Sequence, residues 1–262
     1  MPKFAANLSM LFTEMPFLQR FAAAAKAGFT GVEYVGPYDY PADQIAGLLH
    51  THGLSQVLFN LPLGNWAMGE RGIGCHPDRV GEFQDGVATA IAYAKVLENT
   101  RVNCLAGLLP HGVSRDQAEE TFAANLRFAA GEFLKAGIVL VAEPINSHDM
   151  TGFFLNRSDQ AIAIFDKAGS DNLKLQYDIY HMQRMEGELA LTIERLMPRI
   201  GHFQIAGNPG RTEPDLGEIN YPFLFRLIDR LGYDGWIGAE YRPLGNTADG
   251  LGWLTRKGFA HD

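Results

Sequence analysis

The chain has 262 residues, of which 47% are hydrophobic, and a formal net charge of −8 at pH 7. This size suits a globular protein with one large core, and (β/α)8 barrels commonly need about 250 residues. The acidic balance and the absence of a basic run argue against a nucleic-acid surface, which needs clustered Lys and Arg. No apolar stretch of about 20 residues occurs, so we expect no membrane span.

The two cysteines, Cys75 and Cys104, have no metal-type spacing and are too few for a disulfide framework. The first residues lack the basic and apolar regions of a secretory signal. We therefore expect two free thiols in a cytoplasmic protein. A homo-oligomer is compatible with this composition.

Short apolar strands alternate with amphipathic helices along the chain. The predicted strands span residues 4–7, 31–34, 55–60, 102–105, 138–143, 173–178, 202–206 and 236–240. Helices are predicted from Phe17 onward, over residues 79–97 and 116–134, and around residues 223–231, where apolar side chains repeat with helical spacing. Glycines stop several helices before the next strand, namely Gly28, Gly137, Gly169 and Gly232.

Eight βα units in 262 residues predict a parallel sheet that closes on itself. The predicted fold is α/β, a (β/α)8 TIM barrel that forms a single domain over residues 1–262. An open doubly wound sheet is the alternative. That fold often carries a GxGxxG or GxxxxGKS motif after its first strand, and neither motif is found here.

Several predicted strands end in a polar residue, at the edge where TIM barrels place their reactive groups. Four of these residues belong to consecutive strands five to eight and are about one βα unit apart: Glu143, Asp178, Gln204 and Glu240. Each alone could be an ordinary loop side chain. Together they would repel one another unless a cation lay between them, and an all-oxygen set suits Mg²⁺ or Mn²⁺.

The connection over residues 61–78 is long and rich in glycine, and it contains Trp66 and Arg71. Loops of this length in compact domains are often lids or binding loops. A surface excursion without function is the alternative. We expect a lid, because Trp66 and its apolar neighbours would be poorly placed in solvent.

These residues also carry a family resemblance that extends over essentially the whole chain. The segments FAANLSMLFTE, GVEYVGPYDY, NWAMGERGIGC, VAEPIN, QYDIYHMQRMEGEL, HFQIAGNPGRTEPDLGEINY and GWIGAEYRP resemble the hydroxypyruvate isomerase family, part of the xylose-isomerase-like TIM barrels. The resemblance implies metal-assisted isomerisation of a small keto acid, with Glu143, Asp178, Gln204 and Glu240 as ligands and Glu143 and Glu240 as catalytic acid and base. Wider relatives that epimerise ketoses often have His in place of Gln204.

The family also includes isomerases of 2-oxo-tetronate, which has one carbon more than hydroxypyruvate. The opening segment and the stretch GEINYPFLFRLIDRLGYDGWIG resemble these isomerases. The central segments NWAMGERGIGC and QYDIYHMQRMEGEL are closer to hydroxypyruvate isomerase. Both substrates therefore stay open at this point.

Isomerising such an acid requires a base that removes a proton from the hydroxyl-bearing carbon and an acid that protonates the neighbouring carbon. Two carboxyl groups on either side of a planar enediolate could do both, although direct metal ligation would lower their basicity. The substrate's carboxylate needs a cation, for which Arg211 is the first candidate and Arg71 the second. His181 is predicted to contact a substrate hydroxyl, and Trp66 to cover the bound molecule.

Three other functions are compatible with a metal-binding TIM barrel. They are a sugar-acid dehydratase, a phosphodiesterase of the endonuclease IV type and a non-catalytic binding protein. The phosphodiesterase would need a His-rich metal cluster and a basic groove, and the sequence offers neither. Turnover of a keto acid would exclude the binding protein.

Overall fold

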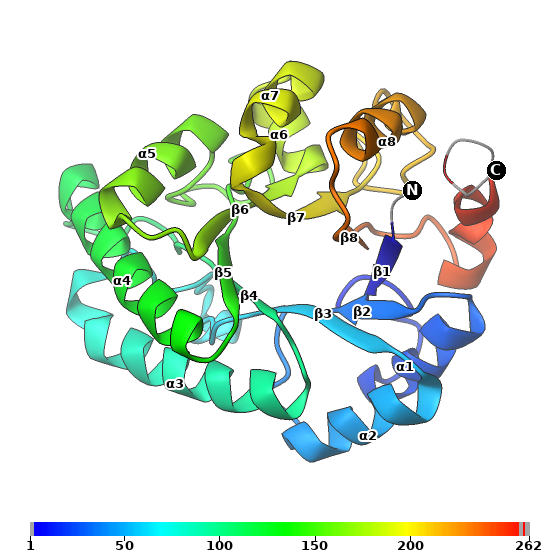
Figure 1. The fold of residues 1–262 in the computed structure, drawn as a ribbon, viewed down its shortest axis with the longest axis horizontal. Helices are drawn as coiled ribbons and strands as arrows, with labels where there is room; N and C mark the ends of the chain where they lie inside the picture. Colours follow the sequence, from blue (N-terminus) through cyan, green and yellow to red (C-terminus); the bar gives the residue numbers. More distant parts are fainter. Residues whose placement is uncertain (1–2, 257–258, 260–262) are drawn as a thin grey trace.

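A computed structural model describes residues 3–256 and Phe259; residues 1–2, 257–258 and 260–262 of the predicted domain lie outside the described residues. Eight parallel strands close into a barrel in sequence order, clockwise when seen from the end where they begin (Figure 1). They are β1 (Lys3–Asn7), β2 (Gly31–Glu33), β3 (Ser55–Asn60), β4 (Arg101–Cys104), β5 (Val139–Ala142), β6 (Leu173–Asp178), β7 (Ile200–Ile205) and β8 (Trp236–Ala239). Because β1 pairs with β8, the TIM barrel is confirmed and the open sheet is excluded.

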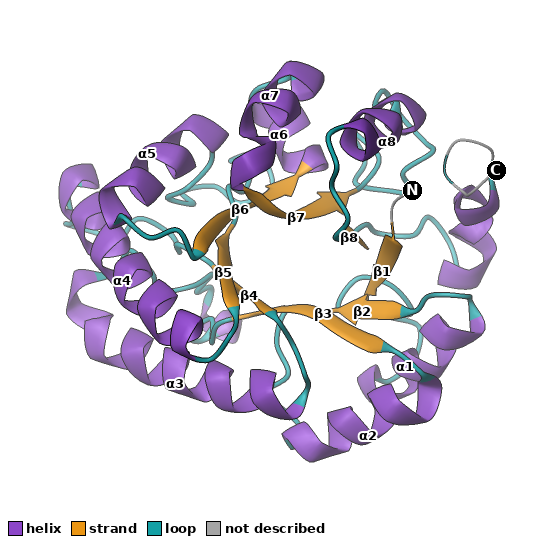
Figure 2. Cartoon of the chain, viewed as in Figure 1, coloured by secondary structure: helices purple, strands orange, loops and turns teal. Residues whose placement is uncertain are grey.

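Helices surround the strands as an outer ring (Figure 2). They are α1 (Phe17–Lys26), α2 (Ala42–His52), α3 (Val80–Val96), α4 (Arg115–Lys135), α5 (Ser158–Ala168), α6 (Ile179–Met185), α7 (Leu189–Leu196) and α8 (Tyr221–Arg230). Two helices, α6 and α7, follow β6, whereas β8 is followed by the 3-10 segment Thr247–Thr255. Within the described residues, no helix combines the length and apolar character that crossing a membrane requires.

The outer helices stay in place because each buries one apolar stripe against the barrel. In α3 the buried residues are Phe83, Val87, Ala90 and Ala94, which share one side of the helix at three- and four-residue spacing. Burying a Val or Phe side chain contributes about 1.5–3 kcal/mol. The predicted glycine stops are confirmed, since all four adopt positive φ: Gly28 (93°), Gly137 (72°), Gly169 (67°) and Gly232 (82°).

The barrel interior changes from apolar to polar toward the strand ends. A small apolar cluster of Ala5, Val57, Leu58 and Val141 fills one part of it. Glu33, fully buried at the end of β2, accepts hydrogen bonds from His202 Nε2 (2.7 Å), Gln204 Nε2 (2.7 Å) and Asn7 Nδ2 (3.0 Å). A Cβ atom at Gly238 would collide with this carboxylate, so glycine is required there.

Candidate active site

Three carboxylates and a histidine converge where β5, β6 and β8 end. Glu143 follows β5, Asp178 is the last residue of β6, and Glu240 follows β8. His181 lies in the first turn of α6. One ligand atom from each of these four residues lies within 4.8 Å of the others. The structure therefore contains a group that could hold a metal ion, at the edge where the strand ends predicted it.

The oxygen atoms of this group fit a divalent cation. Asp178 caps α6, because its Oδ1 accepts from the backbone N–H groups of Tyr180 (2.8 Å) and His181 (3.4 Å). Its Oδ2 is buried and has no hydrogen-bond partner among the described residues. A buried oxygen without a partner costs free energy, and a bound cation would satisfy it. Glu143 and Glu240 bring two more carboxylates to the same point.

Burial raises the pKa of all three carboxyl groups. It raises the pKa of Glu143 well above the ordinary value, and the negative charges of Glu240 and Asp178 add to the effect. Burial also raises the pKa of Asp178 to about 6 and that of Glu240 to about 7, although the positive charge of Arg211 opposes both shifts. Near neutral pH the metal-free group therefore retains protons that a bound cation would displace.

The orientation of Asn146 fixes the proton of His181. Asn146 Oδ1 accepts from the backbone N–H groups of His148 (3.0 Å) and Asp149 (2.8 Å), so its amide nitrogen is the atom that faces His181. That nitrogen lies 2.6 Å from His181 Nδ1 and donates to it. With Nδ1 as an acceptor, a neutral imidazole carries its proton on Nε2, an atom that also lies 3.4 Å from the donor Nη2 of Arg211.

Nε2 of His181 faces the carboxylates, 3.7 Å from Glu143 Oε1 and 3.5 Å from Asp178 Oδ2. Burial lowers the pKa of His181 well below its ordinary value, and the positive charges of Arg211 and Arg184 lower it further. A neutral imidazole with its proton on Nε2 donates a hydrogen bond from that atom and does not ligate a metal through it. This arrangement suits the predicted contact with a substrate oxygen.

Gln204 pairs with Asp178 in the β6–β7 register, but its side chain is hydrogen-bonded to Glu33 and Gln176 inside the barrel. Its Nε2 donates to Glu33, and its Oε1 accepts from Gln176 Nε2 at 2.6 Å. Metal ligation by Gln204 therefore stays a prediction.

Arg211 is held among the carboxylates by its backbone and by its charge. Its Nη2 donates to Glu240 Oε2 at 2.7 Å and lies 3.9 Å from Asp178 Oδ2. Its backbone has φ 53°, a conformation that side chains rarely adopt and that often marks functional residues. Burial works to lower the pKa of Arg211, but the surrounding carboxylates, Glu240 foremost, raise it above its ordinary value. The guanidinium is thus the charge partner of Glu240.

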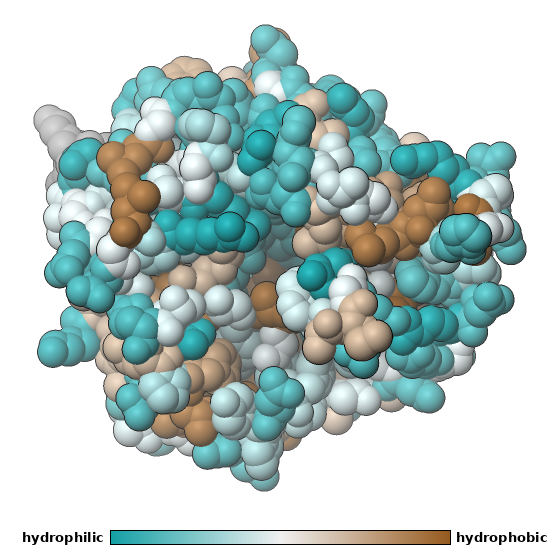
Figure 3. All heavy atoms as spheres, turned by 180° about the vertical axis from the view of Figure 1, so that it is seen from behind, coloured by the Kyte–Doolittle hydropathy of each residue, from teal (hydrophilic) through white to brown (hydrophobic). Residues whose placement is uncertain are grey.

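A cavity of about 340 Å³ opens over this group. Figure 3 shows the face on which the strands end, and this face is hollowed near its centre. The cavity lining comes from loops after most of the strands: Ser9, Met10, Val35, Asn60, Trp66, Arg71, Leu105, Glu143, Ile145, Asp149, Met150, His181, Arg211, Glu240 and Arg242. Six of the eight predicted site residues therefore line one cavity, and Asp178 belongs to the group that Glu143 and Glu240 form.

The predicted lid brings Trp66 and Arg71 to this cavity as a stacked pair. The Arg71 guanidinium lies 3.9 Å from the centre of the Trp66 ring, and its Nη1 donates to the backbone carbonyl of Trp66 at 3.1 Å. Trp66 is 46% exposed, so the ring has free space on one side. A second cavity of about 700 Å³ borders the first, and Trp66 lines both.

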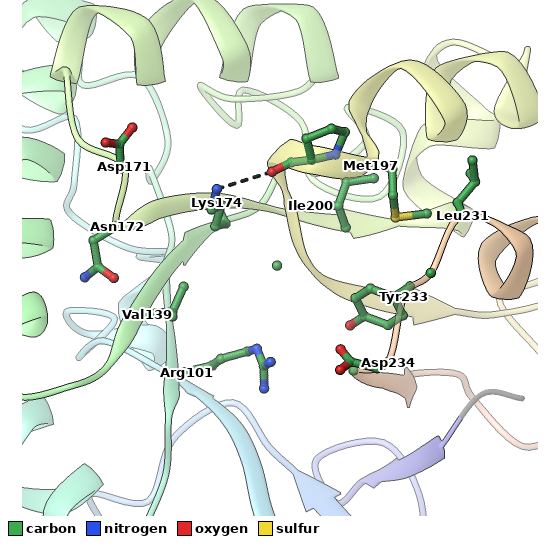
Figure 4. Close-up of a pocket in the computed structure, with 14 residues that line it drawn as sticks. Arg101, Val139, Asp171, Asn172, Lys174, Met197, Ile200, Leu231, Tyr233 and Asp234 are labelled. Atoms are coloured by element: carbon green, nitrogen blue, oxygen red, sulfur yellow. Dashed lines mark hydrogen bonds between the residues drawn. The ribbon is translucent and has the colours of Figure 1, made fainter.

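A third cavity, of about 460 Å³, lies at the other end of the barrel (Figure 4). Its lining includes Arg101, Val139, Lys174 and Ile200, which stand at or near the starts of four strands. Lys174 Nζ donates to the backbone carbonyl of Pro198 at 3.2 Å, as the dashed line in Figure 4 marks. The acidic side chains in its lining, Asp171 and Asp234, are exposed to solvent.

Several side chains that support the site were missed from the sequence. Asn103 Nδ2 donates to Glu143 Oε2 at 3.2 Å, and Asn7 Nδ2 donates to Glu240 Oε1 at 3.0 Å. Asp149 Oδ1 accepts from Arg184 at 2.8 Å. Asn7 was visible as a polar strand end. Asn103, one residue before the end of β4, and Asp149, inside a loop, carried no comparable signal.

Comparisons with known proteins agree with this geometry. Residues 21–257 match the family described as xylose isomerase-like TIM barrel. The chain is 52% identical to hydroxypyruvate isomerase of Escherichia coli (strain K12) and 49% identical to 2-oxo-tetronate isomerase of Cupriavidus necator, each over 97% of this chain and 98% of the relative. A crystal structure from Brucella melitensis named AP endonuclease, family 2, is 45% identical and superimposes with a TM-score of 0.95, covering 97% of this chain and 98% of that one.

The match covers most of the chain, and the curated relatives span almost its full length at about half identity. Both are named as isomerases. The chain belongs to the xylose isomerase-like TIM barrel family and is an enzyme of the isomerase class.

Proposed function

We propose that the enzyme isomerises hydroxypyruvate to tartronate semialdehyde, with 2-oxo-tetronate as the alternative substrate. The observation that carries the proposal is the pair Glu143, which is buried, and Glu240, which is partly buried: two carboxyl groups with raised pKa that line one cavity together with His181 and Arg211. The names of the relatives support a small hydroxy-keto acid and leave its length open between three and four carbons.

In this reaction one glutamate removes a proton from the carbon that bears the hydroxyl group, and an enediolate forms. The other glutamate, protonated beforehand, returns a proton to the former carbonyl carbon. The hydroxyl proton passes to the former carbonyl oxygen, so the carbonyl moves by one position and the hydroxyl takes its place. In the metal-free protein, burial raises the pKa of Glu240 to about 7, and a cation ligated by this carboxylate would lower that pKa and favour the ionised form that acts as a base. His181 Nε2–H donates to a substrate oxygen, and Arg211 stabilises the anionic form of Glu240.

The residues that would hold a metal ion are Glu143, Asp178 and Glu240, with Gln204 as the predicted fourth ligand. Their oxygen atoms favour Mg²⁺ or Mn²⁺. When bound, the cation would act as a Lewis acid toward the negative charge that develops on the two adjacent substrate oxygens.

The lid has a protective role in the proposal. An enediolate must be shielded from water, and closing loops commonly provide the shield. Trp66 and Arg71 already line the cavity, and the partly exposed ring of Trp66 has room to move over a bound molecule.

The decisive experiment is a panel of three- and four-carbon keto acids assayed with Mg²⁺ or Mn²⁺, in H₂O and in D₂O. We expect turnover of hydroxypyruvate, 2-oxo-tetronate or both, with solvent deuterium in the product at the carbon that receives the proton. If the transferred proton exchanges slowly with the solvent, the product should contain less deuterium, but turnover should remain. An enzyme that converts neither acid would overturn the proposal.

A nuclease function, which the name of the Brucella melitensis structure suggests for that protein, finds less support in this chain. The metal-binding group of the described residues contains one histidine, His181, and the net charge of the chain is −8. A phosphodiester substrate would bring further negative charge to an acidic protein.

A further inference from the structure

The charges of the active-site cavity leave one arginine uncommitted. Three arginines line the cavity, namely Arg71, Arg211 and Arg242. Arg71 donates to the backbone carbonyls of Trp66 and Glu70 and stacks on the Trp66 ring. Arg242 is exposed, and its side chain has no hydrogen bond, ion pair or ring contact with any residue that the structure describes.

Arg211 is already engaged by carboxylates of the site. Glu143, Asp178 and Glu240 carry three negative charges when ionised, and a divalent cation together with Arg211 balances them. Arg211 is moreover bound to Glu240 at 2.7 Å. The remaining acidic residue of the lining, Asp149, is paired with Arg184. With these charges balanced, a substrate carboxylate depends for its counter-charge on the remaining arginines of the lining, Arg71 and Arg242, of which Arg71 is held by the carbonyls and ring of the lid.

The backbone places Arg242 next to Arg211. The Arg242 N–H donates to the Arg211 carbonyl at 2.7 Å and so joins the loops after β7 and β8. Arg211 points its guanidinium at Glu240 inside the site, whereas Arg242 lines the same cavity from its exposed side. A carboxylate that projects from the reacting carbons toward the opening would meet Arg242.

We propose that Arg242 is a specificity-determining residue that binds the substrate's carboxylate, adjacent to the Arg211–Glu240 pair. The inference rests on the proposed function and deepens it, because it identifies the feature by which the enzyme selects keto acids over neutral ketoses. Arg242 takes no part in proton transfer. Its loss should therefore weaken substrate binding more than it slows the chemical step.

The test compares Arg242→Gln and Arg242→Lys with wild type in the metal-loaded enzyme. For the accepted keto acid, Arg242→Gln should lower kcat/KM by roughly ten- to hundred-fold, mainly through KM. Arg242→Lys should recover part of this loss, because it restores the charge without the bidentate geometry. Arg226→Gln is the matched control: it removes an exposed arginine on α8 that lies outside the cavity lining and should leave KM unchanged.

One further measurement separates an effect on the substrate from an effect on the metal. Mn²⁺ titration followed by electron paramagnetic resonance should give the same affinity for Arg242→Gln and wild type, since Arg242 is no ligand. A wild-type KM in Arg242→Gln would overturn the inference and leave the isomerase assignment standing. A loss that Arg242→Lys does not relieve, or that falls on kcat alone, would also overturn it. Wild-type protein inactive on every keto acid would instead refute the proposed function, and the inference would fall with it.

Discussion

The two ends of the barrel both carry a cavity with arginine and aspartate side chains, yet they differ in chemistry. The cavity at the strand starts measures about 460 Å³, whereas at the strand ends the cavity over the carboxylates measures about 340 Å³ and the one that borders it about 700 Å³. Its carboxylates, Asp171 and Asp234, are exposed, so water screens them. At the strand ends, Glu143 and Asp178 are 5% and 0% exposed and lie within 4.8 Å of one another. Convergence and burial of charge, rather than cavity size, identify the reactive end.

The largest expected effect of a substitution separates the two ends by catalysis. Glu240→Gln should lower kcat by about 10²–10⁴-fold, because the amide can neither accept nor return a proton at that position. The matched change at the other end, Asp234→Asn, should leave kcat within a factor of two or so of wild type. Circular dichroism checks that both variants fold. Wild-type turnover by Glu240→Gln would remove this residue from catalysis.

The two ends of the barrel should also differ in their effect on metal dependence. Treatment with EDTA should abolish activity, and Mg²⁺ or Mn²⁺ should restore it. Asp178→Asn should raise the metal concentration needed for half-maximal recovery by about tenfold or more, because it removes a carboxylate ligand. Asp171→Asn, at the strand starts, should recover like wild type. Full activity in exhaustively metal-free protein would refute the metal assignment.

The two ends can also be compared by removing an arginine from each cavity, Arg211 at the strand ends and Arg101 at the strand starts. Arg211→Ala should lower kcat/KM by roughly ten- to hundred-fold, the equivalent of about 1.5–3 kcal/mol for a lost charged hydrogen bond. Neutral ketoses should be poor substrates of the wild-type enzyme. Arg101→Ala, in the other cavity, should leave kcat/KM unchanged. If Arg211→Ala is silent, the ion pair with Glu240 does not support catalysis, whereas a neutral ketose that matches the keto acid would reopen the substrate class.

The smallest expected effect is on stability. The folded-state pKa values of Asp178 (about 6) and Glu240 (about 7) exceed the ordinary 3.8 and 4.5. The folded protein therefore holds protons that the unfolded chain releases, and their contribution to stability is present below about pH 4 and lost as the pH rises through 6 to 7.

Scanning calorimetry of metal-free protein should give a lower Tm at pH 8 than at pH 5.5, by about 2–4 °C for each kcal/mol lost. Added Mn²⁺ should raise Tm more at pH 8, because it no longer competes with protons. Glu240→Gln should flatten the pH dependence, whereas Asp234→Asn should keep it. An apo-protein Tm that rises from pH 5.5 to pH 8 would contradict the shifted pKa values.

Much of this site could be predicted from the sequence, for a geometric reason. In a parallel barrel the strand ends share one edge, so residues such as Glu143, Asp178 and Glu240 must approach one another once the strands are recognised. His181 followed because the first turn of α6 starts at the same edge. Length and glycine content marked the lid. The predictions of the carboxylate group and of His181 needed only the chain order and the strand boundaries.

The remaining features depend on side-chain and backbone directions that no local sequence pattern encodes. Glu33, the last residue of β2, is directed into the barrel by the register shift between Val32 and Glu33 and by the space above Gly238. Arg242 faces the cavity because its backbone N–H binds Arg211, whose positive φ no local pattern announced. The sequence also did not predict the 3-10 segment that stands in place of a last outer helix.

The lid is tied down along one half only. A Cβ atom at Gly72 would collide with the backbone of the loop after β4, and a Cβ atom at Gly107, in that loop, would collide with the backbone of Gly72. Residues around Gly72 therefore pack closely on the loop after β4. Glu70 is bound to Arg79, and Cys75 N–H donates to the Ala106 carbonyl at 2.8 Å. The remaining stretch, around Trp66, is exposed. The stretch around Trp66 is itself ordered, as a 3-10 turn over Trp66–Met68 that the Asn65 side chain caps. Because fixing each residue costs about 1–2 kcal/mol in conformational entropy, a lid that is already ordered closes at a small entropic cost and leaves more of the substrate's binding energy for affinity.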